Sequence, residues 1–255
     1  METSAVSFRD LTLGYDGHPA VHHLDGAIER GSLTAVVGAN GSGKSTLLKG
    51  IVGVLPPLGG SVSCATDVRV AYLPQLSELD RSFPATVSDL VALGHWPRRG
   101  LLGWHRREDR KRAADALSAV GLEGFEKRSL DTLSGGQLQR ALFARVLVQD
   151  ADLVLLDEPF NAVDASTVRD LVALIHRWHG EGRTVIVVVH DLDLVRENFP
   201  NALLMARQPV AWGETAETLR PENLLRARRF NEAWNDDADW CAHDGHAVHV
   251  SEKAA

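Results

Sequence analysis

The sequence predicts an α/β protein with a parallel β-sheet that is covered by helices on both faces. Three short runs are almost continuously apolar, at residues 33–37, 153–156 and 184–189. Strands that are buried on both faces have this composition. Helical spacing follows at 45–54, before two prolines, and again at 165–180. Buried strands that alternate with helices are typical of a parallel sheet.

The first residues predict a different kind of sheet. Apolar side chains recur mostly at alternate positions, at Val6, Phe8, Leu11, Leu13 and Tyr15, and an Asp-Gly turn follows. A period of two predicts a hairpin with one buried face, and therefore an N-terminal antiparallel β subdomain. A further strand is expected at 68–73, where Pro74 ends it.

Residues from about 76 to 149 change character, because the spacing becomes helical and charges become frequent. We interpret this stretch as a helical subdomain inserted into one domain that spans residues 1–215. Residues 216–255 lack periodicity, and we interpret them as a C-terminal appendage.

Composition and charge exclude several classes of function. The formal net charge of −7 argues against a nucleic-acid partner. No run approaches the roughly 20 apolar residues of a membrane-spanning helix, and the first ten residues do not resemble a secretion signal. The two cysteines, Cys64 and Cys241, cannot form a disulfide framework. A reduced, cytosolic compartment is the simplest interpretation.

The strand at 33–37 leads into a glycine-rich loop and then into a helix. The loop has the spacing of a phosphate-binding P-loop, with the candidate residues Gly38, Asn40, Gly41, Ser42, Gly43, Lys44, Ser45 and Thr46. Glycines let successive backbone N–H groups point at phosphate oxygens, and the helix adds its positive N-terminal end. Lys44 is expected to contact the β- and γ-phosphates, and the Ser45 hydroxyl to bind Mg²⁺. A glycine-rich turn with an unrelated lysine is the alternative.

The strand at 153–156 runs into two carboxylates, Asp157 and Glu158. Asp157 is expected to reach Mg²⁺ beside the P-loop, because ligands collect at the carboxyl ends of parallel strands. Glu158 can act as general base toward the attacking water. An ordinary acidic strand end is the alternative, and the position relative to Lys44 favours the catalytic interpretation.

Residues 133–137 read Leu-Ser-Gly-Gly-Gln and open a helix predicted at 135–148. Ser134 and Gln137 have the spacing of a capping box. Gly135 and Gly136 are poor helix formers, and we interpret them as places where a ligand approaches the backbone. A plain capped helix is the alternative.

Together these motifs resemble the nucleotide-binding subunit of an ABC transporter, over about residues 4–215. The resemblance implies a P-loop NTPase core of the RecA-like type and an ATPase that uses Mg²⁺. It assigns adenine stacking to Tyr15, Mg²⁺ sensing to Gln75 and contact with the γ-phosphate to His190. It also assigns residues 161–164, from Asn161 to Asp164, to a loop that crosses the dimer interface. A core tyrosine and a surface glutamine are the alternatives at the first two positions.

The resemblance also implies partners. Two copies would form a homodimer in the presence of ATP, with each Lys44 facing Ser134, Gly135 and Gly136 of the other copy, and hydrolysis would open the pair. The chain would lie peripherally at the cytoplasmic face of the inner (plasma) membrane and drive a separate integral membrane permease. An importer also implies an extracytoplasmic metal-binding protein, although absent partners set the direction of transport.

The stretch from Tyr72 to Gly94, with Phe83 and Pro84 before a helix, resembles the zinc/manganese importer branch. Ala162 departs from it, because many relatives carry glycine there. We predict zinc import, with manganese, iron-chelate or haem transport as alternatives. A soluble ABC ATPase outside transport is a further alternative, but no second cassette or long coiled coil is visible. A GTPase is disfavoured because no Asn-Lys-x-Asp motif is found.

Two further features have open interpretations. The tail carries the potential zinc ligands Cys241, His243, His246 and His249, which either bind Zn²⁺ and restrain import or bind nothing. A basic cluster runs between residues 98 and 112. It is either a solvated face or a contact with the permease or with anionic lipid headgroups.

Overall fold

The computed structural model describes residues 3–78, 84–96, 107–161 and 163–235. Its main sheet has six strands in the order β5-β6-β7-β3-β8-β9, and all neighbours are parallel except β8 and β9. The strands are β3 (Leu33–Val37), β5 (Val70–Leu73), β6 (Leu153–Asp157), β7 (Thr184–Val188), β8 (Asn201–Met205) and β9 (Pro209–Glu214). The predicted α/β fold with a parallel core is confirmed.

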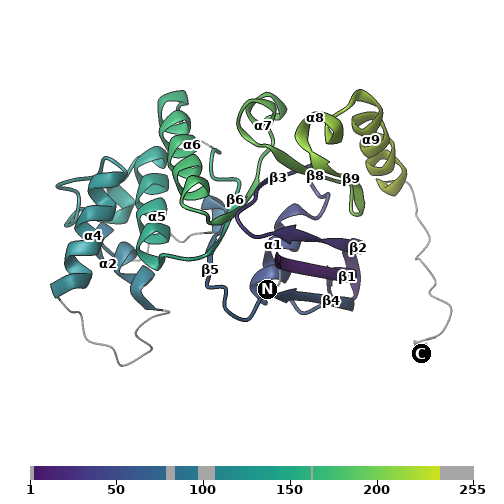
Figure 1. Cartoon of the computed structure of the whole chain (residues 1–255). Coiled ribbons are helices and arrows are strands. Elements are labelled where there is room, and N and C mark those ends of the chain that lie inside the picture. Colours follow the sequence, from purple (N-terminus) through teal and green to yellow (C-terminus); the bar gives the residue numbers. More distant parts are fainter. Residues whose placement is uncertain (1–2, 79–83, 97–106, 162, 236–255) are drawn as a thin grey trace, which may run out of the picture.

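A smaller antiparallel sheet lies beside this core (Figure 1). It has the order β2-β1-β4 and consists of β1 (Ser4–Tyr15), β2 (His18–Glu29) and β4 (Gly59–Cys64). Helix α1 (Lys44–Val52) shares one hydrophobic cluster with both sheets, since Leu47 and Leu48 pack with Leu11 and with Val36. The predicted N-terminal antiparallel sheet is confirmed.

The remaining helices lie on the side of the other face of the main sheet, where most of them share one hydrophobic cluster with it. They are α2 (Val87–Ala92), α4 (Arg107–Ala119), α5 (Gly135–Gln149), α6 (Ala165–Gly180), α7 (Leu192–Asn198), α8 (Thr215–Thr218) and α9 (Pro221–Asn235), with the short 3-10 helices η1 (Leu76–Glu78), η2 (Leu93–His95) and η3 (Leu130–Thr132). On β6, Leu153 and Leu155 join the α1 side whereas Val154 and Leu156 join the helical side. This double burial explains why the strand is continuously apolar.

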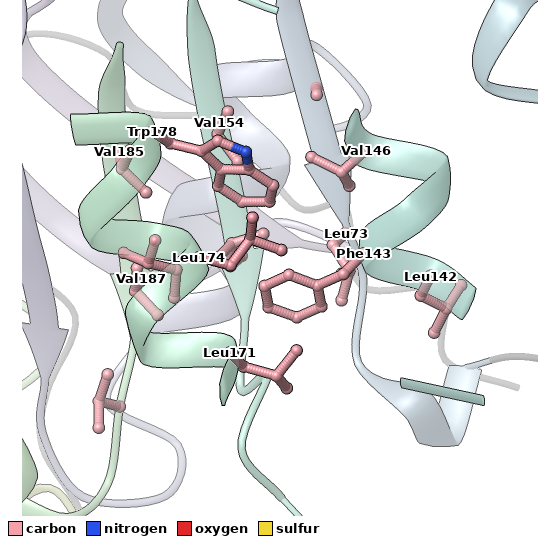
Figure 2. Close-up of a cluster of buried hydrophobic side chains, with 14 of the residues drawn as sticks. Leu73, Leu142, Phe143, Val146, Val154, Leu171, Leu174, Trp178, Val185 and Val187 are labelled. Atoms are coloured by element: carbon pink, nitrogen blue, oxygen red, sulfur yellow. The ribbon is translucent and has the colours of Figure 1, made fainter. Parts of the chain in front are cut away.

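The helical segment α2, α4 and α5 packs together at one end of the molecule (Figure 1) and is joined to the core by helix α5. Phe143 of α5 stacks on Trp178 of α6, with ring centroids 5.6 Å apart, in the cluster shown in Figure 2. Arg145 donates to the backbone oxygen of Tyr72 on β5 at 3.0 Å, and Arg140 donates to Asp170 on α6 at 2.7 Å. The segment therefore has both apolar and polar links to the sheet.

The region after Gly213 is more regular than the sequence predicted. Helix α9 packs Leu224, Ala227 and Phe230 against the main core, and α8 packs on β8 and β9. The apolar positions of α9 are sparse and are interrupted by arginines and an exposed Leu225, which hides the helical period. Among the described residues, no helix combines the length and apolar character that a membrane span requires.

Candidate nucleotide and magnesium site

The predicted site residues gather at the carboxyl edge of the main sheet. Gly38 follows β3, Asp157 ends β6, His190 follows β7, and Gln75 comes two residues after β5. Because these four strands are parallel neighbours, their ends meet at one edge, which is where ligands bind in open α/β sheets.

The P-loop backbone requires its glycines. Gly38, Gly41 and Gly43 all have positive φ angles, of 156°, 77° and 90°, which side-chain-bearing residues rarely adopt. A Cβ at Gly38 would lie 2.3 Å from the Met205 carbonyl oxygen, and one at Gly43 would lie 2.4 Å from the Ala20 oxygen. Asn40 and Gly41 are exposed at the loop tip, whereas Ser42 and Thr46 are buried.

Lys44 begins α1 and folds back over this loop. Its Nζ donates to the carbonyl oxygens of Gly38 at 3.0 Å and of Ala39 at 2.8 Å, and the residue is only 5% exposed. Burial lowers the pKa of Lys44, while the charges of Glu158 and Asp157 act in the opposite direction. A buried ammonium that is held by two carbonyl oxygens favours the approach of an anion.

Oxygen ligands suited to Mg²⁺ converge beside Lys44. The Ser45 hydroxyl donates to Asp157 Oδ1 at 3.0 Å and accepts from Gln75 Nε2 at 3.1 Å. Asp157 is fully buried, and burial raises its pKa to about 6, against the opposing effect of the Ser45 hydrogen bond. A buried carboxylate beside a hydroxyl and an amide fits a small, hard cation with oxygen ligands. Bound there, Mg²⁺ would neutralise phosphate charge.

Glu158 has polar partners at both carboxylate oxygens. Oε1 lies 2.5 Å from His190 Nε2, and Oε2 accepts from Asn161 Nδ2. These side chains line a pocket of about 390 Å³ together with apolar residues that include Phe160, Val163, Val168 and Leu194. A carboxylate that is fixed at the edge of an open pocket can accept a proton from a water molecule there.

The remaining predicted residues have other hydrogen-bond partners or surroundings. Ser134 and Gln137 form the predicted capping box of α5, with Gln137 N donating to Ser134 Oγ at 3.2 Å and Ser134 N donating to Gln137 Oε1 at 3.0 Å. Asp164 caps α6 by accepting from Thr167 N at 2.9 Å. Helix α5 packs on α2, α4 and β5, whereas α1 packs on β1, β2, β4 and β6. Tyr15 is 47% exposed at the end of β1.

Some predictions fall on residues that the structure does not describe. Cys241, His243, His246 and His249 lie outside the described residues, as do Ala162, Phe83 and the part of the basic cluster between 98 and 106. Within the described ranges, no group of three or more His, Cys, Asp or Glu side chains is arranged to hold a metal ion. The zinc site predicted for the tail lies outside these ranges and stays a prediction.

The structure adds two side-chain contacts that the sequence did not predict. The Tyr72 hydroxyl lies 3.4 Å from Asp157 Oδ2, and Asn161 contacts Glu158. Tyr72 lies on the strand beside β6, so the strand order gives a signal for it once the sheet is predicted. For Asn161 the signal is its position three residues after Glu158, which is the spacing of a β-turn.

Comparison with known proteins finds ATP-binding subunits of transport systems. A family model described as "ABC transporter" matches residues 21–161. The zinc transport system ATP-binding protein TroB of Treponema pallidum is 43% identical, over 88% of this chain and 86% of its own length. The manganese transport system ATP-binding protein MntB of Listeria monocytogenes is 38% identical, over 86% of this chain and 94% of its own.

Solved structures agree in fold. A metal-chelate type ABC transporter in an inward-facing conformation superposes with a TM-score of 0.80 at 28% identity, covering 89% of each chain. A dimeric bacterial ABC transporter cassette superposes with a TM-score of 0.73 at 26% identity, over 82% of this chain and 98% of that one.

Proposed function

Because this chain belongs to the ABC transporter family, we propose that it is the ATP-hydrolysing subunit of a zinc importer and drives a separate membrane permease. The observation that carries the proposal is the convergence of Lys44, Ser45, Asp157, Glu158 and His190 at one sheet edge. Zinc is favoured by the relative at 43% identity, whereas manganese, named for relatives at 36–38%, is the second candidate.

Each residue of the site has a chemical task in this proposal. The P-loop N–H groups and Lys44 bind the β- and γ-phosphates. Ser45, Asp157 and Gln75 would hold Mg²⁺, which would neutralise charge on the phosphates. Glu158 accepts the proton of the attacking water. His190 is exposed enough to turn from Glu158 toward the γ-phosphate, since its side chain is 33% accessible.

We also propose that two copies close head to tail over ATP, with Ser134, Gly135 and Gly136 of one copy against the phosphates bound by the other. Ser134 is exposed. A Cβ at Gly136 would meet Thr167 Oγ1 at an ordinary 3.4 Å, and the chain's own packing therefore tolerates alanine there. The backbone and packing of this chain require glycine in the P-loop but do not require it at position 136. Close approach of the ATP phosphates bound by the other copy explains the glycine at 136 better.

The chain is proposed to act at the cytoplasmic face of the membrane, peripherally and bound to its permease. An extracytoplasmic metal-binding protein would deliver the ion from the other side. Selectivity for zinc or manganese is assigned to these partners, because they would contact the transported ion.

The test is transport by the complex that copurifies with this chain from membranes. Vesicles containing ATP and Mg²⁺ are given Zn²⁺ or Mn²⁺ with the cognate binding protein outside, and uptake is measured. We expect uptake of Zn²⁺ above that of Mn²⁺, and its loss in the Glu158→Gln variant. Exclusive Mn²⁺ uptake would reassign the metal, and a soluble chain without any copurifying permease would overturn the transport role.

A further inference from the structure

A tight turn follows strand β6 and carries the Glu158 side chain of the proposed site. Glu158, Pro159, Phe160 and Asn161 form a β-turn in which Asn161 N donates to the Glu158 oxygen at 3.2 Å. Proline is favoured at the second position of such turns, and Glu158 itself has a φ of 50°, a conformation uncommon outside glycine. The first and fourth residues of the turn are thereby brought side by side.

The turn places the Asn161 amide on the Glu158 carboxylate. Asn161 Nδ2 donates to Oε2, while His190 Nε2 lies on Oε1. A carboxylate can only accept hydrogen bonds, so the side of Asn161 that faces Glu158 must be its NH₂ group. Two donors on different oxygens fix the rotation of the carboxylate plane.

The two donors differ in how they are tied to Glu158. His190 comes from the end of another strand, β7, so a shift between strand ends or a turn of its exposed ring breaks the contact. Asn161 belongs to the same turn as Glu158 and moves with it. An amide also leaves the carboxylate its negative charge, whereas Lys or Arg at this position would form an ion pair and neutralise it.

We propose that Asn161 is a positioning residue for ATP hydrolysis: it holds Oε2 of Glu158 so that Oε1 is presented to the attacking water once His190 turns away. The proposal rests on the assignment of Glu158 as general base in the proposed function. Asn161 acts through Glu158, and its loss should therefore lower kcat without changing how the P-loop binds ATP.

Three variants of the full-length protein test this role in steady-state ATPase assays. Asn161→Ala removes the donor, and kcat should fall about tenfold, the effect of one hydrogen bond to a charged group. Asn161→Asp keeps the size and turn preference but replaces the donor by a like charge, and kcat should fall further. The KM for ATP and the affinity for ATP without turnover should stay within about twofold. Asn223→Ala, which removes amide hydrogen bonds on α9, is the matched control and should retain parental kcat.

The design separates a role in the turn from a role toward the carboxylate. If Asn161 only shapes the turn, Asn161→Asp keeps parental kcat and the proposal is overturned. Asn161→Ala is also made in the Glu158→Gln background, where the slow residual single-turnover hydrolysis, followed over long incubations, should show no further loss. Additive losses would contradict the proposal. Parental turnover in Glu158→Gln alone would overturn both the base assignment and this inference, whereas its loss together with parental Asn161→Ala would overturn only the inference.

Discussion

At the scale of single residues, Lys44 is the buried charge on which we propose that phosphate binding depends. Its ammonium is bonded to two backbone oxygens of the P-loop, and an incoming phosphate offers it a full negative charge instead. Lys44→Ala should therefore weaken ATP binding by roughly 10- to 100-fold, the range for a hydrogen bond to a charged group. Titration with a fluorescent ATP analogue measures the change in affinity. Lys127→Ala, at an exposed position, is the control, and unchanged affinity in Lys44→Ala would contradict the assignment.

At the scale of elements, the contact between α5 and α6 is made by the stacked rings of Phe143 and Trp178, both fully buried. Truncating a buried aromatic side chain leaves a cavity, so Phe143→Ala should lower the free energy of unfolding by about 3–5 kcal/mol. Phe143→Leu should lower the free energy of unfolding by less, because leucine fills part of the volume that phenylalanine occupied. Urea unfolding followed by circular dichroism measures both. Equal stability of Phe143→Ala and the parent would show that the stack contributes nothing.

The elements also show what sequence patterns can and cannot predict. Strands β3, β6 and β7 were predictable because burial on both faces makes them continuously apolar. Strand β4, which reads Gly-Gly-Ser-Val-Ser-Cys, has little strand propensity of its own and is held by pairing with β1. Likewise, the Ser45–Asp157–Gln75 cluster follows from strand order, whereas the bonds of Tyr72 and Asn161 depend on side-chain geometry across a strand pair and a turn.

At the scale of the whole molecule, the proposed dimer requires the Ser134 surface of one copy and the Lys44 surface of the other. Glu158→Gln should bind ATP without turnover and accumulate as a dimer, measured by light scattering after size exclusion. Adding Ser134→Arg should return the protein to monomers while single-chain ATP binding persists, because Ser134 lies outside the cluster around Lys44.

Ser134→Arg also removes a helix cap, which costs on the order of 1 kcal/mol, so a matched control is needed. Thr86→Ala removes the equivalent capping box of α2 and should leave the ATP-dependent dimer intact. A dimer that survives Ser134→Arg, or one that Thr86→Ala also abolishes, would contradict the proposed interface.

The hydrogen bond from Arg145 to the Tyr72 carbonyl oxygen has a mechanical consequence. Arg145 is on α5, eleven residues after Ser134, and Tyr72 is three residues before Gln75. When the helical segment tilts, this bond must either break or drag the strand end that bears Gln75. Burial of the guanidinium lowers the pKa of Arg145. Breaking a hydrogen bond of a buried charged group is costly in free energy. We therefore expect a movement of the outer helices to be transmitted in part through this bond to the strand end that bears Gln75.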